Sequence, residues 1–151
     1  DEGWGLYAES LADELGLMPT PEDRFGRLAA RRWRLARVLV DLGVHSRLPV
    51  PDDVAALPGA GREWNRATVT AVLRHHTVIS EGRLRFEVSR HLGWPAQPLA
   101  YAVGERVWQA GRRSAQAQAR TEGGELDLRA FHNRGIDLGS VGLDLLASAL
   151  H

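Results

Sequence analysis

The sequence predicts an all-α protein, a helical array of about six helices. Apolar residues recur at spacings of three and four positions, the period of a helix, and no stretch keeps the two-residue alternation of a β-strand. Proline, glycine and capping residues divide the chain into segments of helix length. With 151 residues, 44% of them hydrophobic and 25% charged, the chain has the size of one ordinary domain.

An amphipathic helix is expected over residues 2–17. Its buried stripe should consist of Trp4, Ala8, Leu11 and Leu15. Gly16 and Pro19 then end the helix, because both residue types are unfavourable inside one. Glu2 and Glu9 lie two turns apart on a separate face, an arrangement more typical of a solvated surface than of a metal-binding or proton-transfer pair.

A second, long helix is expected over residues 21–47. Thr20 supplies a capping hydroxyl and Pro21 suits the first helical position. The buried face should consist of Phe25, Leu28, Leu35, Leu39 and Leu42. Another face carries arginines: Arg24, Arg27, Arg31 and Arg34, with Arg32 and Arg37 nearby. We interpret this arginine face as solvated, or as paired with another part of a longer protein, rather than as a phosphate-binding surface.

The rest of the chain alternates between loops and shorter helices. Residues 48–63 form a loop insert rich in proline and glycine, with at most one short helical turn over residues 52–57. Ser80 and Asp127 are suited to cap two of the later helices. Those helices are expected over residues 64–74, 80–93, 99–119, 127–134 and 141–150. We interpret residues 1–151 as a single helical region, and its start inside a helical pattern indicates a piece of a longer protein.

Composition excludes several classes of function. The chain has 19 basic and 19 acidic residues, so it lacks the positive field of a nucleic-acid-binding protein, and no nucleic-acid partner is expected. It has no cysteine, which excludes disulfide scaffolds, thiol catalysis and cysteine-bound zinc. No apolar run approaches the ~18 residues of a membrane span. The absence of cysteine agrees with a cytoplasmic location, although an export signal could lie in an N-terminal part outside this sequence.

No complete active site is recognisable from the residues alone. None of the six histidines forms a His-x-x-x-His pair or a His-Glu-x-x-His zinc motif. Glu87 and His91 stand at i and i+4 of an expected helix, where an internal pair is favoured over a set of metal ligands. The chain also lacks a Gly-x-Ser-x-Gly elbow, a phosphate loop and a dinucleotide-binding fingerprint.

Several segments nevertheless occur in the order found in a known family. They are residues 2–9 (EGWGLYAE), 41–45 (DLGVH), 87–90 (EVSR), 94–101 (WPAQPLAY), 104–105 (GE) and 131–132 (FH), followed by Gly139 and Leu143. With these motifs, nearly the whole chain outside the loop insert resembles the C-terminal part of the bacterial domain-of-unknown-function 885 family, which is placed among the zincin-like metallopeptidases.

The resemblance implies the C-terminal part of a larger zincin-like helical metallohydrolase, a zinc-dependent peptidase-like enzyme that cleaves a peptide or related amide bond. In that family an upstream His-Glu-x-x-Pro-Gly-His-His segment supplies histidine ligands and a glutamate base. Glu2 would be the carboxylate ligand from a following helix. The implied partners are a peptide-like substrate and the N-terminal part of the same protein. Zinc (Zn2+) is expected in the full-length protein only, and the isolated chain is expected to be inactive.

The resemblance also implies roles for four further residues. His45 and Tyr101 would stabilise the developing oxyanion, and Arg90 and Gln97 would orient the substrate, with Arg90 suited to a carboxylate terminus. Three of the four have a structural alternative. His45 would cap the long helix, Tyr101 would lie in the core, and Arg90 would pair with Glu87 or Glu105.

The sequence departs from the family pattern at several positions. Gly5 replaces alanine in the first helix, and Asn133 stands where an acid is usual. Ala96 and Pro98 replace glycine and alanine on either side of Gln97. These changes leave substrate choice and activity open. The alternative function is a non-catalytic helical protein-interaction module that uses the face from Arg24 to Arg37 as its docking surface.

Overall fold

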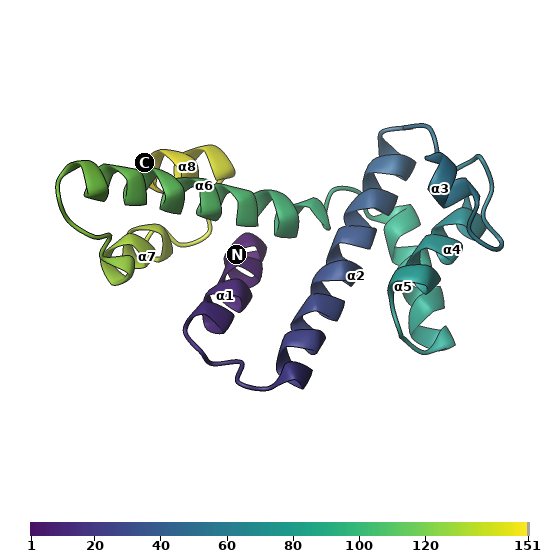
Figure 1. Ribbon diagram of the computed structural model, residues 1–151. Helices are drawn as coiled ribbons and strands as arrows, with labels where there is room; N and C mark the ends of the chain where they lie inside the picture. Colours follow the sequence, from purple (N-terminus) through teal and green to yellow (C-terminus); the bar gives the residue numbers. More distant parts are fainter. Residues whose placement is uncertain (151) are drawn as a thin grey trace. The chain divides into compact units, whose positions relative to one another are not determined.

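The computed structural model describes residues 1–150 and is helical, with no strand in that range (Figure 1). The described residues form eight helices rather than about six. They are α1 (Glu2–Glu14), α2 (Pro21–His45), α3 (Asp52–Ala55), α4 (Arg66–His76), α5 (Glu81–Gly93), α6 (Leu99–Thr121), α7 (Leu128–Ile136) and α8 (Leu143–Leu150). The predicted all-α class is therefore confirmed. None of the described helices is both long and apolar enough to span a membrane.

Local capping explains where four of the eight described helices begin. At the start of α2 the Thr20 hydroxyl accepts the backbone N–H of Asp23, and the Asp23 carboxylate accepts the N–H of Thr20, which completes a capping box. The predicted caps of α5 and α7 are confirmed, because the side chains of Ser80 and Asp127 each accept a backbone N–H three residues on. Asn65 caps α4, so that helix starts slightly later than predicted.

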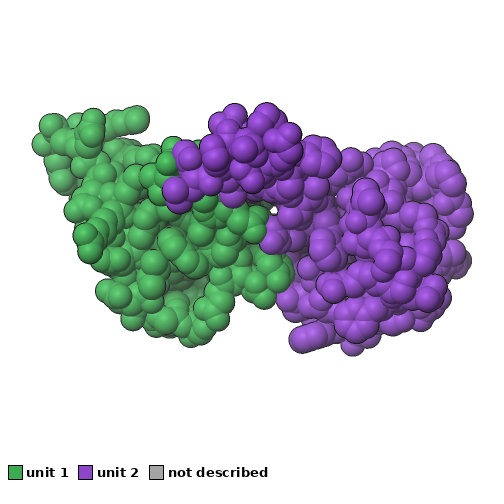
Figure 2. Space-filling view, turned by 90° about the horizontal axis from the view of Figure 1, so that it is seen from below, with its two compact units in different colours: residues 1–15, 100–151 green, residues 16–99 purple. Residues whose placement is uncertain are grey.

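The chain divides into two compact units, which Figure 2 colours separately. Unit 1 contains residues 1–15 and 100–151, and unit 2 contains residues 16–99. The interpretation of residues 1–151 as a single helical region within a longer catalytic domain stays a prediction.

The core of unit 2 lies where α4 and α5 pack against the C-terminal half of α2. Its fully buried members include Val40 of α2, Val69, Val72 and Leu73 of α4, and Leu84 and Val88 of α5. The predicted buried face of α2 is wrong in its first half, because Phe25, Leu28 and Leu35 are 74%, 55% and 44% exposed. The physical reason is that the core cluster of unit 2 begins at Ala36, so the apolar residues on the earlier turns of α2 lie outside it.

The core of unit 1 is aromatic. Tyr7 of α1, Trp108 of α6 and Phe131 of α7 are buried together with Leu146 and Leu150 of α8. The predicted stripe of α1 is only partly correct, because Trp4 and Leu11 pack against this cluster whereas Leu15 is 60% exposed. Leu15 is exposed because it lies just beyond the end of α1.

Two glycines allow α1 and α6 to approach closely within unit 1. A Cβ atom at Gly3 would overlap the backbone of Gly104, and one at Gly104 would lie 2.7 Å from the Cα atom of Gly3. Real side-chain carbons do not approach so near, so both positions require glycine. These glycines belong to the EGWGLYAE and GE segments, and their contact draws Trp4 towards Trp108, with 4.8 Å between ring centroids.

Candidate functional site

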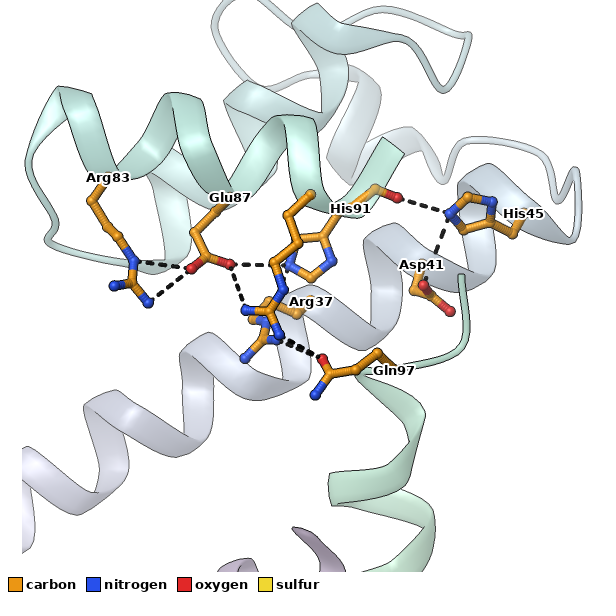
Figure 3. Close-up of polar contacts among 8 residues, drawn as sticks. Arg37, Asp41, His45, Arg83, Glu87, His91 and Gln97 are labelled. Carbon is orange, nitrogen blue, oxygen red and sulfur yellow. Dashed lines mark hydrogen bonds and ion pairs between the residues drawn. The ribbon is translucent and has the colours of Figure 1, made fainter. Parts of the chain in front are cut away.

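A network of buried charged side chains joins α2 and α5 in unit 2 (Figure 3). Arg37 and Asp41 come from α2, and Glu87 and His91 come from α5. Their exposed fractions are between 0% and 6%. Because an unpaired charge in a core is costly, buried groups of this kind need partners. Within the described residues the network supplies them except at Nδ1 of His91, and Oε2 of Glu87 has an ion-pair contact but no hydrogen bond.

Glu87 is the acidic centre of the network. Its Oε1 accepts a hydrogen bond of 2.9 Å from Nε of Arg83, and its Oε2 lies 3.6 Å from a guanidinium nitrogen of Arg90. The ring of His91 is 3.5 Å from the same oxygen. The expected pair of Arg90 with Glu87 is therefore present. His91 lies beside Glu87 but does not pair with it, because its Nε2 accepts from Arg37 and has no proton to donate. One buried carboxylate is thus shared by two arginines.

Two arginines converge on the side chain of Gln97. Arg37 donates a hydrogen bond of 2.9 Å and Arg90 one of 3.1 Å, and both bonds go to Oε1 of Gln97. The Arg90 guanidinium also lies 5.3 Å from the ring centroid of Trp94. Guanidinium groups are well suited to bind carboxylates, because their parallel N–H donors match the two carboxylate oxygens. The two residues that the family resemblance assigned to substrate orientation, Arg90 and Gln97, are thus in contact, and their role stays a prediction. Sequence reasoning missed Arg37, which it placed near the arginine face of the long helix.

His91 is held in its neutral form. Burial lowers the pKa of His91 to about 4, with a further lowering from the nearby positive charge of Arg37. Its Nε2 accepts a hydrogen bond of 3.0 Å from Nε of Arg37, so the ring proton sits on Nδ1. That buried Nδ1 has no hydrogen-bond partner among the described residues. A neutral imidazole is the form that can accept from a guanidinium.

Asp41 and His45 tie α2 to the segment after α5. Both carboxylate oxygens of Asp41 lie 3.0 Å from the backbone N–H of Ala96 and accept from it. Nε2 of His45 donates to the backbone carbonyl of His91 at 2.8 Å and lies 3.9 Å from Asp41. Ala96 has a φ of 69°, a conformation that favours glycine, the residue that the family resemblance leads us to expect at this position. Asp41 thus fixes the turn that presents Gln97.

A second polar contact lies inside the aromatic core of unit 1. The hydroxyl of Tyr7 and Nε2 of His132 share a hydrogen bond of 2.9 Å. Burial raises the pKa of Tyr7 and lowers that of His132, so both groups are neutral near pH 7. The sequence did not predict this pair, because 125 positions separate its members and no spacing rule links them.

Glu2 lines a cavity of about 490 Å³ in unit 1. Apolar and glycine residues form most of the wall. The apolar ones include Trp4, Ile136, Val141, Leu143 and Leu146, and Asp1 lies beside Glu2 as a second acidic residue. Glu2 is exposed, and among residues 1–150 no three His, Asp or Glu side chains lie close enough to hold a metal ion. The described residues therefore do not by themselves fit a zinc ion, because a protein zinc site needs at least three such ligands.

The five residues predicted for the site fall in both units. His45, Arg90 and Gln97 belong to unit 2, where Arg90 contacts Gln97 directly. Glu2 and the half-buried Tyr101 belong to unit 1. The roles of Glu2 in metal binding and of His45 and Tyr101 in oxyanion stabilisation stay predictions.

Comparison with known proteins supports the motifs quoted above. No curated protein matches the chain. The profile of the family described as "Bacterial protein of unknown function (DUF885)" matches residues 1–150. The chain therefore belongs to the DUF885 family of bacterial proteins.

Proposed function

We propose that this chain is the C-terminal, substrate-binding part of a peptidase-like hydrolase that cleaves a peptide or related amide bond. Within it, Arg37 and Arg90 bind a carboxylate of the substrate, and Gln97 holds the two guanidinium groups in place. The observation that carries this proposal is the convergence of both guanidinium groups on one amide oxygen, Oε1 of Gln97.

Charge and geometry support a carboxylate as the ligand. Oε1 of Gln97 is a neutral acceptor, whereas a carboxylate offers two charged oxygens and makes stronger, bidentate bonds to guanidinium groups. Two buried carboxylates belong to this network: Glu87 is shared by Arg83 and Arg90, and Asp41 accepts from the backbone of Ala96. With Arg37, the network thus contains three arginines and two carboxylates. A substrate carboxylate would balance the excess positive charge. The ring of Trp94, 56% exposed, lies beside Arg90 and offers an apolar surface to the adjoining part of a substrate.

The zinc dependence of the activity rests on the family resemblance alone. We include in the proposal that Glu2 is the one carboxylate ligand this chain contributes and that the remaining ligands lie in the N-terminal part of the protein. The cavity beside Glu2 is large enough for a substrate side chain and mainly apolar. Metal analysis of the full-length protein tests this. Zinc content should fall in Glu2→Gln and stay unchanged in Glu63→Gln, another exposed glutamate.

The carboxylate role is tested with the full-length enzyme and a pair of peptide substrates that differ only in a free or amidated C-terminus. Arg90→Met should raise KM for the free acid about tenfold or more and leave KM for the amide nearly unchanged. Arg85→Met, which removes an exposed arginine of the same helix, is the control. Equal effects of Arg90→Met on both substrates would contradict the proposal.

A second candidate function is a helical protein-interaction module. It is favoured by the exposed apolar side chains on the N-terminal half of α2. The docking face differs from the one the sequence indicated, because Arg37 is buried and faces His91 and Gln97 instead.

A further inference from the structure

Two adjoining hollows in unit 2 form a groove along the N-terminal half of α2. One hollow of about 630 Å³ lies between α2 and the residues around the end of α4, and a second of about 390 Å³ lies further along α2. Leu28, Arg32 and His76 line both hollows. Along α2 the groove reaches from Phe25 to Leu39, which at 1.5 Å per residue is about 21 Å.

The groove is apolar and open to solvent. Phe25, Leu28 and Leu35 are largely exposed along its length, and Val78 is fully exposed at its far wall. A contiguous patch of exposed apolar side chains on a protein surface often marks a binding surface, because its exposure to water is unfavourable. The hollows are concave, so they fit a convex element such as a helix rather than the flat surface of a membrane.

The rim of the groove is basic. Arg31, Arg32 and Arg74 line it, and no aspartate or glutamate is among the described residues of either wall. Arg74 is paired with Glu81, whereas Arg32 donates hydrogen bonds to two neutral acceptors, Nδ1 of His76 at 3.0 Å and the carbonyl of His75 at 3.5 Å. Asp53 acts electrostatically on His76, but it is not among the residues that line the groove, so the charge of Arg32 is not met by a carboxylate of the groove wall.

His76 contributes to the same electrostatic pattern. Burial, followed by the nearby charge of Arg32, lowers the pKa of His76. The imidazole is therefore neutral near pH 7 and accepts from Arg32, which orients the guanidinium across the groove. An acidic group on a bound partner would find a fixed cation next to an apolar surface.

We propose that this groove binds an acidic amphipathic helix of a partner protein. Apolar side chains of that helix fill the two hollows, and its flanking Asp or Glu side chains pair with Arg32. About 14 helical residues match the length of the groove. This proposal does not rest on the carboxylate site at Gln97, although the two adjoin, because Trp33 of the groove wall lies 5.7 Å from the guanidinium of Arg37.

The test uses two fluorescein-labelled synthetic helical peptides of about 14 residues. Both carry leucines at helical spacing, one flanked by glutamates and the other by lysines, and binding is followed by fluorescence anisotropy. The acidic peptide should bind the chain and the basic one should not. Phe25→Ser should weaken binding of the acidic peptide about tenfold, whereas Phe86→Ser, at another exposed phenylalanine of unit 2 outside the groove, should not change it.

Arg32→Gln should reduce the preference for the acidic over the basic peptide. The acidic peptide should still bind measurably, because its leucines still contact the apolar groove. Equal binding of the acidic and basic peptides to the wild-type chain would overturn the proposal without any variant. Equal loss of affinity in Phe25→Ser and Phe86→Ser would do the same. Binding to vesicles of anionic lipid in place of the peptide would assign the groove to a membrane. Self-association that Phe25→Ser abolishes would assign it to a second copy of the chain.

Discussion

Nε of Arg37 donates a hydrogen bond of 3.0 Å to Nε2 of His91, two groups that would repel each other if both were charged. The contact exists because His91 is buried and neutral while Arg37 remains a cation. It allows Arg37 to extend its other end to Gln97, where Arg90 also binds. The neutral histidine thus holds the arginine pair on which the proposed carboxylate site depends.

This arrangement predicts a loss of stability in acid. The pKa of His91 is about 4 in the folded chain against an ordinary 6.5, so between these values the unfolded chain binds more protons. The free energy of unfolding should therefore fall as the pH drops from about 6.5 to 4, by up to about 3 kcal/mol. Urea unfolding of the wild type and of His91→Gln across this range measures it. Carboxylates titrate in the same range, so the contribution of His91 is the difference in free energy of unfolding between the wild type and His91→Gln. If that difference does not change with pH, His91 is not neutral in the folded chain.

Glu87 should contribute far more stability than an exposed glutamate with a similar partner. Glu87→Gln removes the buried charge that Arg83 and Arg90 share, and we expect a loss of about 3 kcal/mol in the free energy of unfolding. Glu81→Gln breaks the exposed pair with Arg74 and should cost less than about 1 kcal/mol. Chemical denaturation of both variants provides the comparison. Similar losses would mean that the network is more solvated than its burial indicates.

Two glycines of α1 should respond in opposite directions to the same substitution. In Gly5→Ala the added Cβ atom would have no other atom within 4 Å apart from its neighbours along the chain. This substitution should raise the free energy of unfolding by up to about 1 kcal/mol, because alanine has a higher helix propensity than glycine. Gly3→Ala would force α1 away from Gly104 and should destabilise the chain by about 1–3 kcal/mol. Thermal unfolding followed by circular dichroism distinguishes the two. A neutral Gly3→Ala would show that the helices do not cross so closely.

The turn that presents Gln97 contains removable backbone strain. Ala96 has a φ of 69°, so Ala96→Gly should stabilise the chain by up to about 1 kcal/mol. The reverse exchange at Gly59, where φ is 81° and no atom is within 4 Å, should destabilise it by a similar amount. Denaturation midpoints of both variants are the measurement. If Ala96→Gly is destabilising, residue 96 does not adopt the left-handed conformation.

Much of the helical pattern was predictable because its signals are local. Thr20, Ser80 and Asp127 each cap the helix that follows, and their partners lie three residues away. Even the short α3 falls inside the one helical turn expected in the loop insert. Such contacts depend on neighbouring residues only, so a single sequence contains the information for them.

Burial and long-range pairing were not predictable in the same way. Apolar residues recur with the helical period along the whole of α2, but α4 and α5 cover only its second half. Periodicity shows which face of a helix is apolar and not how much of that face a packed helix covers. Arg37 looked like one member of an arginine face, although it is buried against His91, 54 positions away. The family motifs indicated Arg90 and Gln97, while the third member of that cluster required the three-dimensional structure.

The most direct test of the carboxylate site is a nuclear magnetic resonance titration of the arginine side chains. The Nε–H signals of Arg37 and Arg90 in the labelled chain are followed while N-acetylalanine, or its amide as the uncharged control, is added at pH 7. We predict that the free acid shifts both signals and the amide shifts neither. Equal responses to acid and amide, or shifts confined to other arginines, would contradict the assignment of a substrate carboxylate to this pair.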